Sequence, residues 1–279
     1  MKLALRELRR RPGRFVIATA ILTLIAMLLM FLGALLDGLT AGSTGALRAQ
    51  QGDLIVYSST AQDSLVRSRI TPEVRADVEK GADGATVSGL GSVQLGARID
   101  GHGPRDLVPV VLFGYESAPR GVPAGIPPAG EVYADRSLES EGVRTGSVIR
   151  LGPARSPLTV IGFLDDSRYS GQGTVWGSLD TWRSVLAANR PAQRVGPGVT
   201  QALVVGSGAS AEAIDRATGG ATSTLTIAQA IDALPGVSQQ QTVFNQIIGV
   251  TVVIALVVVA LFSALITVER TALYGVLKA

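Results

Sequence analysis

Phe15–Leu36 reads FVIATAILTLIAMLLMFLGALL and Ile247–Val268 reads IIGVTVVIALVVVALFSALITV, two runs of 22 residues without a charged side chain. A helix of this length rises roughly 33 Å, enough to cross the ~30 Å hydrocarbon core of a bilayer. Core helices of soluble proteins rarely lack charge on every face over such a length. The sequence therefore predicts two transmembrane helices, at 15–36 and 247–268.

A signal peptide is the alternative for the first run, because the start of the chain is basic and Ala41-Gly42-Ser43 offers small residues for cleavage. The apolar run is longer than the ~7–15 residues usual in a signal peptide. We therefore expect it to stay as an anchor.

The charges beside the two runs predict how the chain is oriented. Residues 1–14 carry six basic residues and one acidic residue, a net charge of +5, and residues 269–279 carry a net charge of +1. The remainder of the chain is left with a net charge of −3. Because positive flanks stay on the cytoplasmic side, both ends are predicted inside and 37–246 outside. An arginine cluster can also bind nucleic acid, but the apolar run directly after it argues against such a partner.

Composition excludes several classes of protein. Hydrophobic residues make up 47% of the chain and charged residues 17%, against about 25% charged in a typical soluble domain. There is no cysteine, and His102 is the only histidine. Disulfide scaffolds, thiolate metal centres and multi-histidine metal sites are therefore excluded, and no cofactor is expected.

Residues 37–246 are predicted to fold as an α+β domain. Short β-branched runs bounded by Gly, Pro or Asp indicate strands at 53–58, 86–99, 107–113, 131–134, 147–151, 158–164 and 201–205. Helices are predicted after the capping residues Thr71, Ser178, Ser210 and Thr226. The strands and helices interleave without a strict βαβ repeat. Glycine and proline are dense in 101–130, which we interpret as a hinge or a boundary between two subdomains, one on each side.

Motifs of catalysis are weak in this sequence. None of the lysines follows a glycine, so the chain has no phosphate-binding P-loop of its own. His102 lies in a glycine-flanked turn and is expected to be a solvated loop residue. The pair Asp165 and Asp166 follows a predicted strand, where aspartate is common for turn formation. We therefore predict no enzyme activity in this chain.

Several segments resemble the FtsX/MacB-type family of ABC transporter permeases. Tyr274-Gly275-Val276-Leu277-Lys278-Ala279 is similar to the "EIGVLKAIG"-like helix that follows the second span in that family. Residues 142–149 (GVRTGSVI) resemble its turn and strand, and residues 158–163 (LTVIGF) resemble a second strand. Residues 130–134 (GEVYA) and the basic amphipathic start, residues 5–14, also fit its layout. Thr271, Ala272 and Leu273 depart from the charged residues that are commoner there.

The resemblance implies a permease in a bacterial inner or plasma membrane, with a MacB-type periplasmic core domain between its first two spans. It implies a dimer of permeases, a separate cytoplasmic ATPase subunit, and room for a periplasmic or extracellular adaptor. It assigns 269–279 to the start of a coupling helix, with Leu273, Tyr274, Val276 and Leu277 as the ATPase contact. Family members continue into a third and a fourth span. We therefore expect this chain to be a fragment, the alternative being a half-permease that pairs with another chain.

Two other classes remain open from the sequence. A two-span sensor or an envelope-anchored binding protein would also place a folded domain between two spans. Sensors usually carry a long cytoplasmic signalling domain, whereas only 14 and 11 residues are predicted to face the cytoplasm here. An envelope-anchored hydrolase is disfavoured by the single histidine.

Overall fold

The computed structural model describes residues 12–103, 105–123, 125–234 and 237–276 of the chain. Residues 39–238 form one compact unit, which we call the sheet domain. The described residues before 39 and after 238 form a second unit. The chain therefore divides shortly after the first apolar run and shortly before the second.

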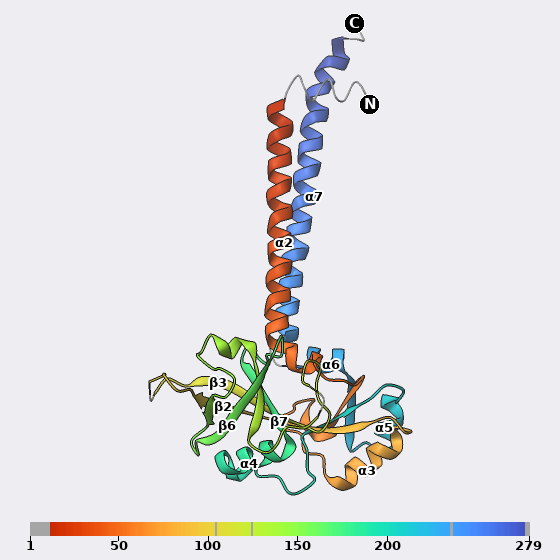
Figure 1. The fold of residues 1–279 in the computed structure, drawn as a ribbon. Coiled ribbons are helices and arrows are strands. Elements are labelled where there is room, and N and C mark those ends of the chain that lie inside the picture. Colours follow the sequence, from red (N-terminus) through yellow and green to blue (C-terminus); the bar gives the residue numbers. More distant parts are fainter. Residues whose placement is uncertain (1–11, 104, 124, 235–236, 277–279) are drawn as a thin grey trace. The chain divides into compact units, whose positions relative to one another are not determined.

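Two long helices carry the apolar runs, α2 (Pro12–Arg48) and α7 (Val237–Val276) (Figure 1). Thr19–Arg48 and Thr242–Ala264 are long and apolar enough to cross a membrane, and the most apolar stretch of each is not buried inside the structure. Met30, Leu24 and Leu256 are 75%, 66% and 64% exposed. Soluble monomers rarely expose apolar surface on this scale, whereas a bilayer accepts it. Both predicted runs thus lie within single helices that extend beyond them.

The sheet domain contains the remaining elements of secondary structure. Its strands are β1 (Leu54–Ser58), β2 (Val87–Arg98), β3 (Val108–Tyr115), β4 (Glu131–Asp135), β5 (Val148–Leu151), β6 (Ser156–Leu164), β7 (Gly173–Ser178), β8 (Ala202–Val205) and β9 (Thr222–Thr226). Its helices are α3 (Pro72–Gly81), α4 (Leu179–Asn189), α5 (Ala211–Ala217) and α6 (Ile227–Asp232), with short 3₁₀ turns η1 (Ser59–Ala61), η2 (Arg136–Glu139) and η3 (Pro191–Gln193).

The strands of the described residues form a closed ring that shares its longest strand with a second, open sheet. The ring runs β2-β3-β7-β4-β6-β5 and returns to β2. The open sheet runs β2-β8-β1-β9. The first residues of β2, Val87–Leu90, pair with β8, whereas Leu90–Ala97 pair with β3. Because β2 belongs to both sheets, the ring and the open sheet share a continuous backbone connection.

Helices cover the hydrophobic faces of both sheets. The side chains of α4 join the core of the ring, where Trp182 is fully buried. Trp182 lies so close to Gly91 and Gly114 that a Cβ on either glycine would come within 2.5 Å of it. On the open sheet, α3 and α5 lie side by side and pack Val78 and Ile214 against β1 and β8 (Figure 1). Each of these helices therefore buries its apolar side chains against strands of the sheet that it covers.

The predicted α+β class is confirmed, and so are the four helices expected after Thr71, Ser178, Ser210 and Thr226. Two strands were not predicted. β7 (GTVWGS) lies between a glycine-rich turn and a helix cap, and those signals hide it. β9 (TSTLT) is polar because its Thr222 and Thr224 side chains donate to the Asp215 carboxylate at the edge of the sheet.

The glycine- and proline-rich stretch 101–130 is not a boundary between subdomains. It contains β3, which is a strand of the ring and pairs with β2 on one side and with β7 on the other. The turn residues shape the loops before and after this strand. The sheet domain is one compact unit across this stretch.

Candidate functional site

The residues predicted to contact an ATPase are placed only in part. Leu273, Tyr274 and Val276 belong to the last turns of α7, and Leu277 lies outside the described residues. Their role as a contact therefore stays a prediction. The other residues considered from the sequence lie in the sheet domain.

Asp165 and Asp166 do not act as a pair, because each turns to a different arginine. Asp165 forms an ion pair with Arg136, and Asp166 lies 3.4 Å from the Arg48 guanidinium. His102 is less exposed than expected: its Nδ1 lies 3.2 Å from an Asp106 carboxylate oxygen and its Nε2 lies 2.9 Å from the Glu141 carbonyl oxygen. Among the residues that the structure describes, no group of three or more His, Asp or Glu side chains could hold a metal.

The C-terminal end of α2 is packed into the sheet domain. Leu39–Arg48, which we call the α2 tail, belongs to the sheet domain although it continues the apolar helix without a break. Thr44, Ala46 and Leu47 are fully buried there. The α2 tail is therefore packed into the sheet domain.

The α2 tail is held by residues 165–172, which we call the β6–β7 loop. The Ser170 and Gly171 amides donate to the Ser43 and Gly42 carbonyl oxygens at 3.0 and 3.1 Å. The Ala46 amide in turn donates to the Arg168 carbonyl oxygen at 3.1 Å. Backbone groups of a helix interior thus bond to a loop that is more than 100 residues away in sequence.

Gly45 makes this close approach possible. A Cβ built on Gly45 would lie 2.3 Å from the Asp166 carbonyl oxygen, a distance at which the backbone would have to move. Glycine in a helix interior costs about 1 kcal/mol relative to alanine, so a helical glycine usually has a packing reason. This glycine is the signal that sequence reasoning missed.

The β6–β7 loop adopts a demanding backbone conformation. Asp166, Ser170 and Gly171 have φ values of 55°, 50° and 76°. Tyr169 and Gln172 exchange backbone hydrogen bonds of 3.0 Å around Ser170-Gly171, a two-residue turn with the positive φ values of a type I′ hairpin. Non-glycine residues with positive φ values persist only where the surrounding structure holds them, and they are concentrated at ligand clamps and switch regions.

Buried polar contacts hold the base of the loop. The Asp135 carboxylate, 2% exposed, accepts hydrogen bonds from both the amide and the hydroxyl of Ser137 and of Ser167. Thr174 donates to the Ser167 carbonyl oxygen at 2.9 Å and accepts from the Trp176 indole N–H at 2.8 Å. The loop is therefore fixed to β4 and β7 on its domain side.

An aromatic cluster continues this path into the core. The Tyr169 ring meets Phe113 edge-on at 5.3 Å, and Phe113 stacks on Trp176 at 4.6 Å. Burial raises the pKa of Tyr169 to about 12, so its ring stays neutral at physiological pH. A displacement of the α2 tail would thus meet packed and hydrogen-bonded groups from the loop to the ring of strands.

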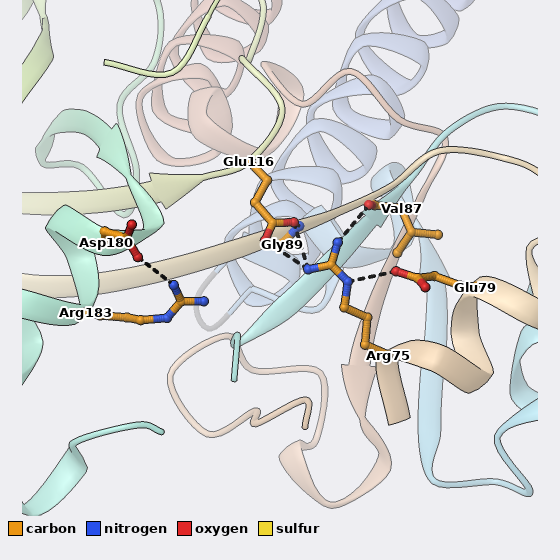
Figure 2. Close-up of polar contacts among 7 residues, drawn as sticks. All are labelled: Arg75, Glu79, Val87, Gly89, Glu116, Asp180 and Arg183. Carbon is orange, nitrogen blue, oxygen red and sulfur yellow. Dashed lines mark hydrogen bonds and ion pairs between the residues drawn. The ribbon is translucent and has the colours of Figure 1, made fainter. Parts of the chain in front are cut away.

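A second polar cluster ties the open sheet to the ring (Figure 2). Arg75 on α3 lies 2.9 Å from Glu116 and from Glu79, and donates to the Val87 carbonyl oxygen at 3.2 Å. The Glu116 Oε2 atom also accepts from the Gly89 amide at 2.6 Å. Because Val87 and Gly89 lie where β2 passes between the two sheets, this cluster stabilises the crossing.

Glu116 carries a pH dependence with a definite sign. Partial burial opposes its ionisation, but hydrogen bonds from Arg75 and Gly89 and the charges of Arg75 and Arg183 outweigh it, so its pKa is lowered. A carboxyl with a lowered folded-state pKa stabilises the protein above its unfolded-state pKa, and that contribution is lost as the pH falls through the folded-state pKa.

We therefore expect Glu116→Gln to lower the free energy of unfolding of the sheet domain at pH 7 by about 1–3 kcal/mol, because a charge-assisted hydrogen bond is lost. The thermal midpoint should fall accordingly. The difference from the unmodified protein should shrink as the pH falls below the ordinary glutamate range. Thermal melts of both proteins at pH 7 and pH 3.5 measure this. A difference that is the same at both pH values would contradict the assignment.

The described residues also form one broad groove, with a volume of about 370 Å³. It lies between α4 and the start of β6, and its floor includes Val185 and Leu158. No charged side chain lines it. The groove therefore lacks acid–base chemistry and offers only an open, mostly apolar surface.

No protein-family model matches the sequence. The solved structures that are similar to this chain include the following two. The extracellular domain of the noncanonic ABC-type transporter YknZ from Gram-positive bacteria has 14% identity and a TM-score of 0.39, over 62% of this chain and 98% of that chain. The periplasmic region of MacB from Actinobacillus actinomycetemcomitans has 8% identity and a TM-score of 0.43, over 68% of this chain and 95% of that chain. Both TM-scores lie below 0.5, so neither likeness assigns this chain to a family.

Proposed function

We propose that this chain is the membrane component of an ABC transporter of the FtsX/MacB type, in which a cytoplasmic ATPase drives movement of the sheet domain outside the membrane. The observation that carries the proposal is α2, a single helix from Pro12 to Arg48 whose apolar part runs into a tail embedded in the sheet domain. A rigid helix is suited to carry a displacement across a bilayer. The sequence motifs at 142–149, 158–163 and 274–279 support the same assignment.

The proposed orientation places the N-terminus in the cytoplasm and the sheet domain outside a bacterial inner or plasma membrane. It rests on the net charge of +5 in residues 1–14 and +1 in residues 269–279. The segment after the second span then lies inside, where an ATPase can reach it. The cargo is an unidentified substrate that is exported or extracted.

The proposed partners follow from the same resemblance. ATP hydrolysis belongs to a separate subunit, and this chain contributes no catalytic residue. A second permease copy would complete the transporter, with a periplasmic or extracellular adaptor as a further partner. Leu273, Tyr274, Val276 and Leu277 are the proposed contact with the ATPase. By helical spacing, Leu273, Tyr274 and Leu277 share one face, suited to a helix-in-groove contact.

A double change at this contact tests the proposal. Tyr274→Asp with Leu277→Asp should lower ATPase association at least tenfold, because two charges would enter an apolar contact. Thr271→Asp with Gly275→Asp adds the same charge on the helical face that points away from the four proposed contact residues, and serves as the matched control. Co-purification from detergent measures association, and tryptophan fluorescence checks that the sheet domain stays folded. Equal association of both variants and the unmodified protein would contradict the assigned contact.

The second candidate is a membrane-anchored binding protein or two-span sensor, and the groove beside α4 is the observation that favours it. Such a protein would bind a neutral, mostly apolar ligand, because no charged side chain lines the groove. The neighbouring gene distinguishes the candidates. An adjacent ABC ATPase supports the transporter, and an adjacent kinase supports the sensor.

A further inference from the structure

We infer that α2, and not α7, is the lever that moves the sheet domain, and that the β6–β7 loop is the point where the lever is attached. This inference rests on the proposed function and adds which of the two spans delivers the movement. It concerns the residues of the sheet domain alone, together with the continuity of each helix.

The two long helices enter the sheet domain to very different extents. The domain includes ten residues of α2, Leu39–Arg48, but only Val237 and Ser238 of α7. The α2 tail buries Thr44, Ala46 and Leu47 and exchanges three backbone hydrogen bonds with the β6–β7 loop. A load on α2 would therefore act on packed backbone. Of the two α7 residues in the sheet domain, Val237 has a described side chain, and it is buried.

The attachment uses groups that a helix normally pairs internally. In an α-helix the Ala46 amide donates to the Gly42 carbonyl oxygen. The Ala46 amide also donates to the Arg168 carbonyl oxygen, and the Gly42 carbonyl oxygen also accepts from the Gly171 amide. The β6–β7 loop thus bonds to the Ala46 amide and to the Gly42 carbonyl oxygen, which lie one helical turn apart. An axial shift or a rotation of the α2 tail must therefore displace the loop or break these bonds.

The tip and the base of the β6–β7 loop differ in how firmly they are held. Its tip, Ser170-Gly171, has positive φ values, while its base is fixed through Ser167 to Asp135. Because the base is fixed at Ser167, a displacement of the α2 tail acts on the residues that follow it, 168–172, which include the tip. From there Tyr169 reaches the aromatic cluster of Phe113 and Trp176.

Two matched insertions in the full-length protein test the lever. Four glycines are inserted between Gly38 and Leu39 in one variant, and between Ser238 and Gln239 in the other. Each is reconstituted with the ATPase, and hydrogen exchange of the peptide covering Tyr169–Gln172 is compared with and without ATP. We expect at least a threefold ATP-dependent change in exchange rate in the unmodified protein and in the α7 insertion, and loss of that change in the α2 insertion.

The alternative outcomes are distinct. A response that survives the α2 insertion, or that only the α7 insertion abolishes, overturns the lever while leaving the ATPase assignment intact. Ser170 and Gly171 amides that exchange as fast as unprotected amides in the protein without nucleotide overturn the attachment. If no ATPase associates with the unmodified protein, the proposed function fails and the lever fails with it.

Discussion

Replacing Gly45 with alanine should destabilise the sheet domain by about 1–3 kcal/mol, the usual cost of forcing extra atoms into a packed site. The new Cβ would lie 2.3 Å from the Asp166 carbonyl oxygen, so the α2 tail and the β6–β7 loop must separate. The sign is informative because glycine to alanine in a helix otherwise stabilises by up to about 1 kcal/mol. Only the contact with the loop reverses that gain.

Tryptophan fluorescence during a thermal melt measures this effect. Trp176 and Trp182 are the two tryptophans of the chain, and both are fully buried in the sheet domain, so the signal reports that domain. Gly38→Ala is the matched control, since a Cβ on Gly38 meets nothing within 4 Å in the same helix. The control should melt at the same temperature or higher. A Gly45→Ala protein that melts with the control would show that the α2 tail is not held as described.

Asp135→Ala should be the more damaging of the two changes, with a loss of about 3 kcal/mol or more. The substitution removes the acceptor of four hydrogen bonds from Ser137 and Ser167, and Ser167 is itself 2% exposed. Buried donors left without an acceptor cost about 1–3 kcal/mol each. The base of the β6–β7 loop would lose its anchor.

Asp165→Ala is the control for this change. Its side chain is 74% exposed and its ion pair with Arg136 lies at the surface, where such pairs contribute at most about 1 kcal/mol. Chemical unfolding followed by fluorescence compares the two variants. Similar midpoints for Asp135→Ala and Asp165→Ala would refute the anchoring role of the buried carboxylate.

Local sequence signals predicted most of the fold because they depend on near neighbours. Thr71, Ser178, Ser210 and Thr226 each cap a helix, since a side-chain oxygen before a helix accepts an amide from its first turn. The apolar runs identified both long helices for the same reason. Strands β7 and β9 were missed because their tertiary partners, rather than their own residues, place them in the sheet.

The candidate site was not predictable in the same way. The bonds from Ser170 and Gly171 to the α2 tail join residues more than 120 positions apart, and they involve backbone atoms that carry no residue type. Gly42 and Gly45 lie beyond the predicted span 15–36, and Gly42 was considered only as part of a cleavage site. Asp166 was interpreted as an ordinary turn residue, whereas its carbonyl oxygen is the group that Gly45 approaches.

We propose that this chain connects a cytoplasmic ATPase to the sheet domain across a membrane. The most direct measurement is affinity purification of the full-length protein from detergent, followed by an ATP hydrolysis assay and identification of the bound subunits. We expect an ABC ATPase in stoichiometric amount, with hydrolysis activity that the Tyr274→Asp, Leu277→Asp double variant loses. A purified protein that carries no ATPase, or one whose bound ATPase is unaffected by that double change, would contradict the claim.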